Sequence, residues 1–537
     1  MRSALPADAL RRAARLHPSK AAVLELGDQR TTYAVMDERA NRLANALGQH
    51  GIGLAPGERL AIVLENGPAY WEVYFGAARA GVVVVPINTH LTPTEMAYVI
   101  EDADASALLY DAPSAAPAAA LLERVGRSHL RATIAIGSAV DAAVEGRQYE
   151  ALLAEASPRP PRVLVGEDSP LLQIYTSGTT GQPKGVVLSH RAMLANAQAQ
   201  VLGHYLRHDD VFLTATPLYH LAGAARIFAT CLVGATQYVV PTFEPDQMLE
   251  LVEREGVTGT LLVATMARAL LDALDERAYD LRSLRSVCHG AAPTPLEVLQ
   301  AAVERLPAEH YVGWGLTEGG VFLTALRPDE YLPARGGAAR RLASAGRELS
   351  GAEVNVLGPS GQVAAPGEPG EMVVRSDRMM TEYWKRPAET AEVLRELEID
   401  GLPPASWLLT GDVAYADEDG FLYIVDRKKA MIVSGGVNVY PREIEQVLSA
   451  HPAIREVAVV GIPSERWGEV PRAFIVRRSG MPLTEAQVLE YCRERLARFK
   501  VPAAVEFRET LPHTAIGKVA VAELAEPYWR GYAKRVN

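Results

Sequence analysis

Residues 175–186 read YTSGTTGQPKGV and gather polar groups that suit phosphate oxygens. Glycines let backbone N–H groups turn toward an anion, hydroxyl side chains donate hydrogen bonds, and Lys184 adds a positive charge. The stretch is not a Walker loop, because Pro183 precedes the lysine and Gly185 follows it. A flexible polar surface turn is the alternative, and the length of the run favours a loop that binds phosphate.

Further short motifs follow this loop along the chain. WGLTE (314–318) sets an aromatic ring near adjacent Thr and Glu residues, and TGD (410–412) ends in an acidic residue. DRKKAMIVSGGVNVYPREIE starts at residue 426, and LPHTAIGK (511–518) ends in a lysine. Two further segments near the start of the chain are TYAVMDERANRLANAL and AGVVVVPIN. Together with the polar loop, all these motifs resemble the signatures of the adenylate-forming superfamily and occur in the same order. That superfamily contains acyl-CoA synthetases, luciferases and the adenylation domains of peptide synthetases.

The resemblance implies a reaction in two halves. A carboxylate attacks the α-phosphate of ATP to give an acyl-adenylate and pyrophosphate, and the thiol of coenzyme A then attacks the acyl carbon and releases AMP. Neither half needs a protein nucleophile, so the protein must supply alignment and charge stabilisation. The implied α/β fold has a large N-terminal domain of layered α/β subdomains (1–427), a hinge (428–429) and a small mobile C-terminal α+β domain (430–537).

The resemblance also implies roles for the motif residues. Lys518 would be the catalytic lysine that swings onto the carboxylate and α-phosphate, and Thr317 would reach the same phosphate. Glu318 would hold Mg²⁺, a cation that prefers oxygen ligands. Asp412 would accept hydrogen bonds from the ribose hydroxyls, since a carboxylate has two acceptor oxygens, and Arg427 would support the nucleotide. The other implied ATP-binding residues are Thr176, Ser177, Gly178, Thr179, Thr180, Lys184, Gly290, Ala291, Ala292, Trp314 and Gly315.

Each role has a plainer alternative. Trp314 stands where the family usually has Tyr, and a core aromatic would look the same from sequence as a ring stacked on adenine. Taken alone, Glu318 would be a solvated loop carboxylate, Arg427 a surface salt bridge and Lys518 a surface lysine. Their positions inside the motifs favour the functional roles.

The hinge and the thiol site also follow from the resemblance. Lys429 matches the hinge position about which the family rotates its small domain. Gly435 and Gly436 would let the backbone lie along the pantetheine arm of coenzyme A, because glycine permits close approach. A simple tight turn is the alternative for this glycine pair.

The pocket for the acid is expected between PLYHLAGAAR, LLVATM, CHGAAP and GWGL. His220 matches a recurrent histidine of the family, although an ordinary packed histidine is an alternative, and Gly223 is one of several small residues that leave volume. His289 replaces the first glycine of the common Gly-Gly-Ala pattern, which puts the shape or polarity of the pocket in doubt. An amino-acid substrate is disfavoured, because the segment near residue 220 lacks the Phe-Asp pair that binds an α-ammonium. Acyl chains, aryl acids and polycyclic acids all remain open.

The acceptor is expected to be coenzyme A, because the single-chain architecture resembles acyl-CoA synthetases. The alternatives are an acyl-AMP ligase that serves a carrier-protein thiol, a catalytically idle nucleotide-binding protein, and a luciferase-like oxygenase. The complete set of motif residues argues against the idle protein. Either a monomer or a homodimer is compatible with the sequence.

Composition narrows the class of protein. The 537 residues are 48% hydrophobic and 22% charged, as expected of a globular protein, and the net charge of -11 argues against nucleic acid as the main partner. We expect no secretion signal and no membrane span, because no apolar h-region and no long apolar run is present. The three cysteines, Cys231, Cys288 and Cys492, are scattered, which fits a reducing cytoplasm.

Alternating helix and strand patterns must position these motifs. From about residue 34, helical segments (36–51, 69–81) alternate with strand segments (61–66, 82–88), which predicts layered, largely parallel sheets. A further helix should begin after Thr92, with Pro93 at its first position and Glu95 completing a capping box.

The later part of the chain changes character. Residues 156–162 (ASPRPPR) predict a surface connector, and 334–346 predict a loop before strands within 353–363 and 371–376. The small domain should contain two helices (441–450 and 483–499, the latter with a Thr484–Gln487 capping box) and two strands (456–462 and 472–478).

Overall fold

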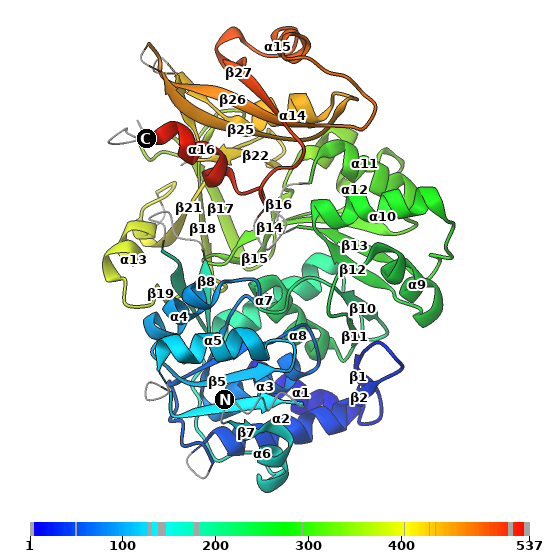
Figure 1. Cartoon of the computed structure of the whole chain (residues 1–537), viewed down its shortest axis with the longest axis vertical. Helices are drawn as coiled ribbons and strands as arrows, with labels where there is room; N and C mark the ends of the chain where they lie inside the picture. The colour runs from blue at the N-terminus through cyan, green and yellow to red at the C-terminus, as the bar shows by residue number, and fades with distance from the viewer. Residues whose placement is uncertain are drawn as a thin grey trace.

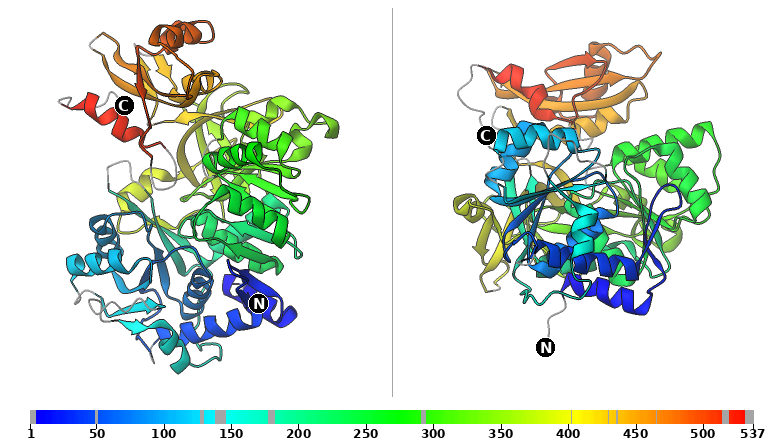
Figure 2. Two further views of the ribbon diagram at one scale, coloured as in Figure 1. Left: turned by 45° about the vertical axis from the view of Figure 1, so that its right-hand side comes forward. Right: turned by 60° about the horizontal axis from the view of Figure 1, so that its bottom comes forward.

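The structure is a computed structural model, and the residues it describes are 5–48, 51–126, 130–137, 146–176, 182–290, 294–401, 403–428, 430–434, 437–464, 466–513 and 519–530. The chain forms a large N-terminal α/β domain and a small C-terminal domain, which sits at one end of the long axis (Figure 1). The same arrangement is visible after rotation (Figure 2). The predicted fold class is confirmed.

One large sheet carries most of the later motifs. Its central strands are parallel, and antiparallel strands close both ends. In spatial order the strands are β16 (Arg347–Glu348), β15 (Gly320–Leu326), β14 (Glu309–Leu316), β13 (Ser286–His289), β12 (Gly259–Leu262), β10 (Val211–Thr214), β11 (Thr236–Val239), β1 (Ala21–Leu24) and β2 (Arg30–Thr32).

A second large sheet carries the polar loop. In spatial order its strands are β19 (Glu382–Tyr383), β9 (Lys184–Ser189), β8 (Pro170–Thr176), β4 (Val83–Pro86), β3 (Arg59–Val63), β5 (Ala105–Asp111), β6 (Ala132–Ile136) and β7 (Arg147–Gln148). The strands from β4 to β7 pair in parallel, whereas β8, β9 and β19 pair in antiparallel fashion. The hairpin of β8 and β9 therefore lies near one edge of this sheet.

Helices fill the space between the two sheets and cover their outer faces. Successive residues of a strand point to opposite faces, and Phe212 of β10 and Ile62 of β3 share one central core while Leu213 and Ala61 face two outer cores. The central helices are α1 (Pro6–Leu16), α2 (Tyr33–Leu47), α3 (Ala69–Ala80), α7 (His190–His204) and α8 (Leu221–Val233). The outer core of the first sheet is covered by α9 (Pro245–Glu255), α10 (Ala264–Glu276) and α11 (Leu296–Arg305), and that of the second by α4 (Pro93–Asp102) and α5 (Ala115–Val125) (Figure 1).

A smaller antiparallel sheet leads from the large domain toward the small one. It contains β17 (Ala352–Leu357), β18 (Gly370–Ser376), β21 (Ala405–Ala416) and β20 (Leu394–Leu397), with β22 (Leu422–Arg427) paired to β21. The remaining helices of the large domain are α6 (Tyr149–Glu155), α12 (Pro328–Tyr331) and α13 (Pro387–Val393).

The small domain contains more elements than the sequence predicted. Its sheet comprises β24 (Val437–Val439), β23 (Ile432–Ser434), β26 (Gly468–Arg477), β25 (Ile454–Ser464) and β27 (Ala504–Arg508), and its helices are α14 (Pro441–Ser449), α15 (Glu485–Arg493) and α16 (Val521–Trp529). The prediction of two strands and two helices was therefore incomplete, since β23 and β24 are too short to show a pattern. The helix predicted to reach residue 499 ends at Arg493 and gives way to a short 3-10 turn at Arg498–Lys500.

Several local predictions are confirmed. Thr92 and Glu95 form a capping box at the start of α4, and Thr484 and Gln487 form another at α15. Residues 156–162 contain no helix or strand and are mostly exposed, whereas the loop expected at 334–346 contains short 3-10 turns. Each of the three cysteines is free and buried.

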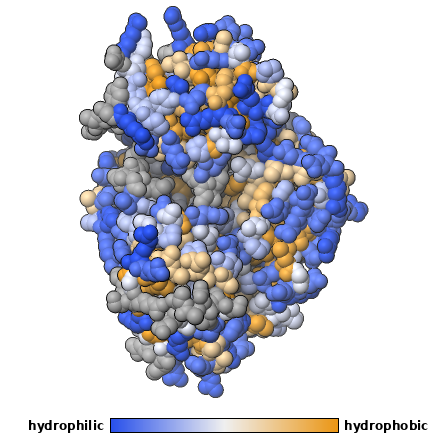
Figure 3. All heavy atoms as spheres, in the orientation of Figure 1, coloured by the Kyte–Doolittle hydropathy of each residue, from blue (hydrophilic) through white to orange (hydrophobic). Residues whose placement is uncertain are grey.

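The surface is ordinary for a globular protein. Within the described residues, no helix is long and apolar enough to cross a bilayer. Hydrophilic side chains predominate on the face drawn in Figure 3, and the apolar ones form separate small patches.

Candidate active site

The ends of the polar loop are fixed by the β8–β9 hairpin. Thr176 is the last residue of β8, Lys184 is the first of β9, and the two are paired across the ladder. On the other side of β9, Tyr383 of β19 pairs with Val186, and the Lys184 ammonium lies 5.0 Å from the centre of the Tyr383 ring. The loop lysine, a hydroxyl and an aromatic ring therefore share one sheet edge.

Glu318 reaches this edge from the first sheet. It lies in the turn between β14 and β15, and its Oε1 accepts hydrogen bonds from Thr176 Oγ1 (3.2 Å) and Tyr383 Oη (3.1 Å). Its backbone carbonyl accepts a third from Met380 N (2.8 Å). Burial and the nearby Glu318 charge raise the pKa of Tyr383 well above its ordinary value, so the phenol stays protonated and donates.

Tyr383 is a site residue that sequence reasoning missed. It lies in TEYWKRP, outside every motif, and only the fold brings it between Lys184 and Glu318. No signal in the sequence separates this tyrosine from a packed aromatic, because both are flanked by ordinary polar residues.

A second group joins Trp314, Asp412 and Arg427. Trp314 Nε1 donates to Asp412 Oδ2 (3.0 Å), and Arg427 Nε contacts Asp412 Oδ1 (2.6 Å). Asp412 and Arg427 are paired across β21 and β22, which explains why residues 15 positions apart meet. The Asp412 side chain is 5% exposed and that of Arg427 is 62% exposed. The Asp412 carboxylate is thus held from two sides, by Trp314 and by Arg427 of the neighbouring strand.

Glycines allow the backbone to pack closely around these residues. A side chain at Gly315 would collide with the carbonyl of Gly320 across the β14–β15 hairpin. Gly290 follows β13, and a Cβ there would lie 3.1 Å from the carbonyl oxygen of Gly313. Thr317 lies in the same turn as Glu318. The WGLTE segment and the end of β13 are therefore immediate neighbours.

Part of the predicted site lies outside the described residues. Those residues are Ser177, Gly178, Thr179, Thr180, Ala291, Ala292, Lys429, Gly435, Gly436 and Lys518. Their neighbours are described: Lys428, beside the hinge position, contacts Glu371 through its ammonium at 2.8 Å.

The three residues assigned to the acid pocket differ in character. His220 is the N-cap of α8, and Gly223 in the first turn has no room for a Cβ, which would strike the backbone of Pro217. His289 is fully buried, and its Nε2 lies 2.9 Å from His310 Nδ1 with the two rings stacked. The substitution at position 289 therefore adds a buried polar group behind the end of β13.

Glu318 is suited to Mg²⁺. Among the described residues, no group of three or more His, Cys, Asp or Glu side chains is arranged to hold a metal ion. Magnesium usually keeps several waters and binds one or two carboxylates together with substrate phosphates. A single carboxylate oriented by two hydroxyl donors, beside a loop suited to phosphate, fits that pattern.

Comparison with known proteins agrees with this geometry. The family described as AMP-binding enzyme matches residues 10–384, and the AMP-binding enzyme C-terminal domain matches 443–518. A feruloyl-CoA synthase from Amycolatopsis sp. is 36% identical over 518 residues, which are 96% of this chain and 97% of that protein. The fatty acid–[acyl-carrier-protein] ligase ScoC of Streptomyces coeruleorubidus is 34% identical over 524 residues, 97% of this chain and 96% of that one.

A solved structure shows the same fold with a reaction intermediate. It is the o-succinylbenzoate CoA synthetase MenE of Bacillus subtilis in complex with the acyl-adenylate OSB-AMP. The two structures superpose with a TM-score of 0.80 at 29% sequence identity, and the match covers 96% of this chain and 97% of that chain. The chain therefore belongs to the AMP-binding enzyme family of adenylate-forming ligases, as an AMP-forming acid–thiol ligase of the acyl-CoA synthetase type.

Proposed function

We propose that this chain activates a carboxylic acid with ATP and Mg²⁺ and transfers the acyl group to coenzyme A. The observation that carries the proposal is the convergence of Thr176 and Tyr383 on Glu318, with Lys184 beside the Tyr383 ring. This arrangement would join a phosphate-binding loop to a metal-binding carboxylate. Mg²⁺ bound at Glu318 would neutralise charge on the phosphate oxygens. Lys184 would add a second positive charge at the pyrophosphate.

The nucleoside would be held by the Trp314, Asp412 and Arg427 group. Asp412 is nearly buried and oriented by both neighbours, so it enters the reaction without reorganising. We infer that its carboxylate accepts the ribose hydroxyls, while the indole lies against the adenine. Arg427, which is mostly exposed, would approach the nucleotide from the domain junction.

The small domain would supply the last group. We infer a boundary at residue 427, a hinge at 428–429 and a small domain from 430 to 537, with Lys518 as the catalytic lysine. Two observations support this division: β22 ends at Arg427, and Asp426 Oδ2 accepts a hydrogen bond from the backbone of Arg442 (3.0 Å), which links the two domains beside the nucleotide group. A rotation about the hinge would let Gly435 and Gly436 border the thiol in the second half-reaction.

Coenzyme A is the proposed acceptor, and a carrier-protein thiol is the second candidate. Similarity to a feruloyl-CoA synthase supports the first, and the similarity to ScoC supports the second. We also infer a cytoplasmic location, which agrees with three buried, unpaired cysteines.

Pyrophosphate release with a panel of acids tests the proposal. The full chain is incubated with ATP, Mg²⁺ and each acid, with and without coenzyme A, and the products are identified by mass spectrometry. The proposal predicts acid-dependent pyrophosphate and a CoA thioester. Acid-dependent pyrophosphate without a thioester would favour the carrier-protein acceptor, and no pyrophosphate with any acid would contradict the proposed function.

A further inference from the structure

Helix α8 carries a single charged residue, Arg226, on an otherwise apolar sequence, LAGAARIFATCLV. The residue is 2% exposed, and its guanidinium lies over the Phe212 ring of β10 at 3.9 Å from the ring centre. Arg226 Nη2 contacts His204 Nδ1 at the end of α7. Arg226 Nη1 is buried and has no hydrogen-bond partner among the described residues.

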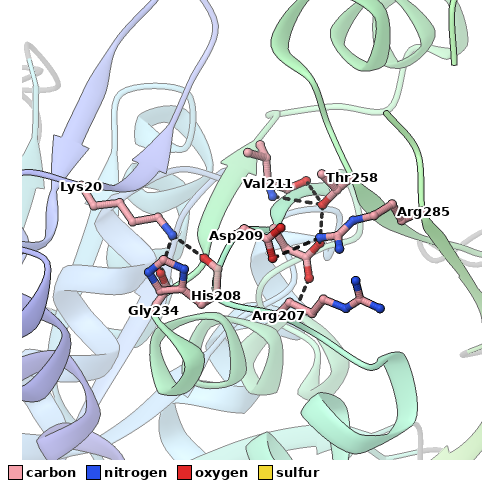
Figure 4. Close-up of polar contacts among 9 residues, drawn as sticks. Lys20, Arg207, His208, Asp209, Val211, Gly234, Thr258 and Arg285 are labelled. Atoms are coloured by element: carbon pink, nitrogen blue, oxygen red, sulfur yellow. Dashed lines mark hydrogen bonds and ion pairs between the residues drawn. The ribbon is translucent and has the colours of Figure 1, made fainter. Parts of the chain in front are cut away.

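The Arg226 charge also lacks a paired carboxylate within the part of the chain that the structure describes. Asp210 exerts a Coulombic effect on Arg226, but that carboxylate is engaged elsewhere. It accepts hydrogen bonds from Thr258 Oγ1 (2.5 Å) and the Arg207 backbone (2.6 Å), and it contacts Arg285. Figure 4 shows Thr258, Arg207 and Arg285 gathered beside Asp209, the residue that precedes Asp210. Asp210 therefore balances Arg285 and leaves Arg226 without an ion pair.

Burial affects Arg226 and its histidine neighbours in different ways. It lowers the pKa of Arg226 to about 9, so the guanidinium remains charged at pH 7. Burial also lowers the pKa of His204 well below its ordinary value, and that of His289 likewise, so both imidazoles are neutral. The Arg226 cluster (Arg226, His204 and His289) therefore carries one uncompensated positive charge, and such a charge in a protein interior is unfavourable until an anion pairs with it.

The hydrogen bonds define what this cluster offers to a ligand. Because Arg226 donates to His204 Nδ1, the His204 proton resides on Nε2, which is buried and has no partner among the described residues. Arg226 Nη1 and His204 Nε2 are thus two donors beside a positive charge. His289 donates from Nε2 to His310 and leaves its Nδ1 as an acceptor.

The Arg226 cluster adjoins the proposed nucleotide site. His204 meets the Phe322 ring edge to face, with centres 5.0 Å apart. Phe322 in turn packs against Gly313, where a Cβ would lie 2.5 Å from the ring, and Gly313 immediately precedes Trp314. His289 immediately precedes Gly290, which is itself a neighbour of Gly313. The cluster therefore lies one layer behind the strands that carry WGLTE, in the region expected to receive the acid.

We propose that Arg226, assisted by His204, binds a second carboxylate at the far end of the acid substrate, so that this chain activates dicarboxylic acids. The inference rests on the proposed function and specifies its substrate class. A guanidinium can donate hydrogen bonds to both oxygens of a carboxylate in a paired geometry, and the anion supplies the missing counter-charge. One carboxylate of the acid would react at the α-phosphate while the other stays bound in the Arg226 cluster.

Matched acids test this proposal directly. Wild-type chain is assayed by pyrophosphate release with ATP, Mg²⁺ and coenzyme A on hexanoate, 6-hydroxyhexanoate and adipate, and on the same three types with eight and ten carbons. A site built to pair with a polar group strongly rejects analogues that lack it. We therefore expect kcat/KM for the diacid to exceed that of the monoacid by at least about 100-fold at the preferred length.

Three variants identify the residue responsible. Arg226→Met removes the charge at similar volume and should bring the diacid-to-monoacid ratio close to one. Arg226→Lys should keep a reduced preference for the diacid, since it retains the charge without the paired geometry. Arg79→Met serves as the control, because Arg79 is likewise a buried arginine but pairs with Asp37 of α2, and its ratio should match wild type. The ratio is internal to each sample, so a loss of folded protein does not change it.

The outcomes separate the substrate proposal from the proposed function. A wild-type enzyme that uses monoacids as well as diacids, or prefers the hydroxy acids, would overturn the inference. So would an unchanged ratio in Arg226→Met or, if that variant does not fold, in Arg226→Lys. Activation of fatty or aryl acids without any diacid would refute the inference alone, whereas no turnover with any acid would refute the proposed function.

Discussion

Replacing Tyr383 by phenylalanine tests how Glu318 is positioned. The change removes only the phenolic oxygen, which donates to Glu318 Oε1 at 3.1 Å, and keeps the ring that lies 5.0 Å from the Lys184 ammonium. Among the described residues, Glu318 Oε1 then retains the Thr176 hydroxyl at 3.2 Å as its remaining side-chain donor. The carboxylate should become free to rotate away from the phosphate loop.

The size of the effect follows from the type of hydrogen bond. Tyr383 is 8% exposed and its phenol donates to a carboxylate, so little solvent screening of this hydrogen bond is expected. A hydrogen bond to a charged group is worth about 1.5–3 kcal/mol, and each 1.4 kcal/mol is about a factor of ten in rate. We expect Tyr383→Phe to lower kcat/KM for ATP by roughly 10–100-fold. Tyr383→Leu also removes the ring beside Lys184 and should lower it by roughly a further 2–30-fold.

The assay is pyrophosphate release at saturating acid, with ATP and Mg²⁺ varied separately. If Glu318 holds the metal, the Mg²⁺ concentration at half-maximal rate should rise in Tyr383→Phe. Tyr149→Phe is a matched control, because Tyr149 is also buried and donates to a carboxylate, Glu72, at 2.6 Å, but it lies in α6. The control should lose thermal stability and keep its activity. Full activity of Tyr383→Phe at every Mg²⁺ concentration would refute this account of the site.

Three further changes probe other parts of the chain. Lys518→Ala should slow adenylate formation by on the order of 100-fold, since a charge pair near 4 Å is worth roughly 4 kcal/mol. The same variant should spare thioester formation from supplied acyl-adenylate. Equal loss in both half-reactions would contradict the assigned role. Trp314→Phe keeps a ring but removes the donor to Asp412 (3.0 Å), so KM for ATP should rise about 3–10-fold. An unchanged KM would show that this hydrogen bond does not position the carboxylate. Burial raises the pKa of Glu445 to about 7 from its ordinary 4.5, so the folded state binds a proton that the unfolded state releases between those values. Wild type should therefore lose about 2 kcal/mol of stability relative to Glu445→Gln as pH rises from about 5 to 8, measured as the difference in melting temperature across pH; parallel pH profiles would rule out this titration.

The motif residues of the site could be predicted from the sequence, whereas the residue that orients Glu318 could not. The motifs supplied Thr176, Lys184, Glu318 and Asp412, because each belongs to a short continuous pattern, and the structure brings the first three together at one sheet edge. Tyr383 could not be found in this way. Its contacts depend on a two-residue strand, β19, whose pairing is decided by the fold rather than by local sequence.

The contacts of buried polar groups were also not predictable from the sequence. Arg226 left a signal, a lone charge on an apolar helix, but its partner His204 ends a different helix and only tertiary packing joins them. Helix starts were predictable where a capping box exists, as at Thr92. The end of α15 was not, because ERLARF after Arg493 retains helix-forming residues and the turn there is set by packing of the small domain.

The pairing of Thr176 with Lys184 across β8 and β9 has a consequence for variation at this site. The two residues close the hairpin, so the ladder beneath them, and not the loop between them, sets their relative positions. Changes of length or composition at 177–181 would leave both end residues in place. A slip of one residue in the β8–β9 register would instead turn one of them to the opposite face of the sheet. The alignment of the two strands therefore constrains Thr176 and Lys184 separately from the phosphate contacts predicted for residues 177–180.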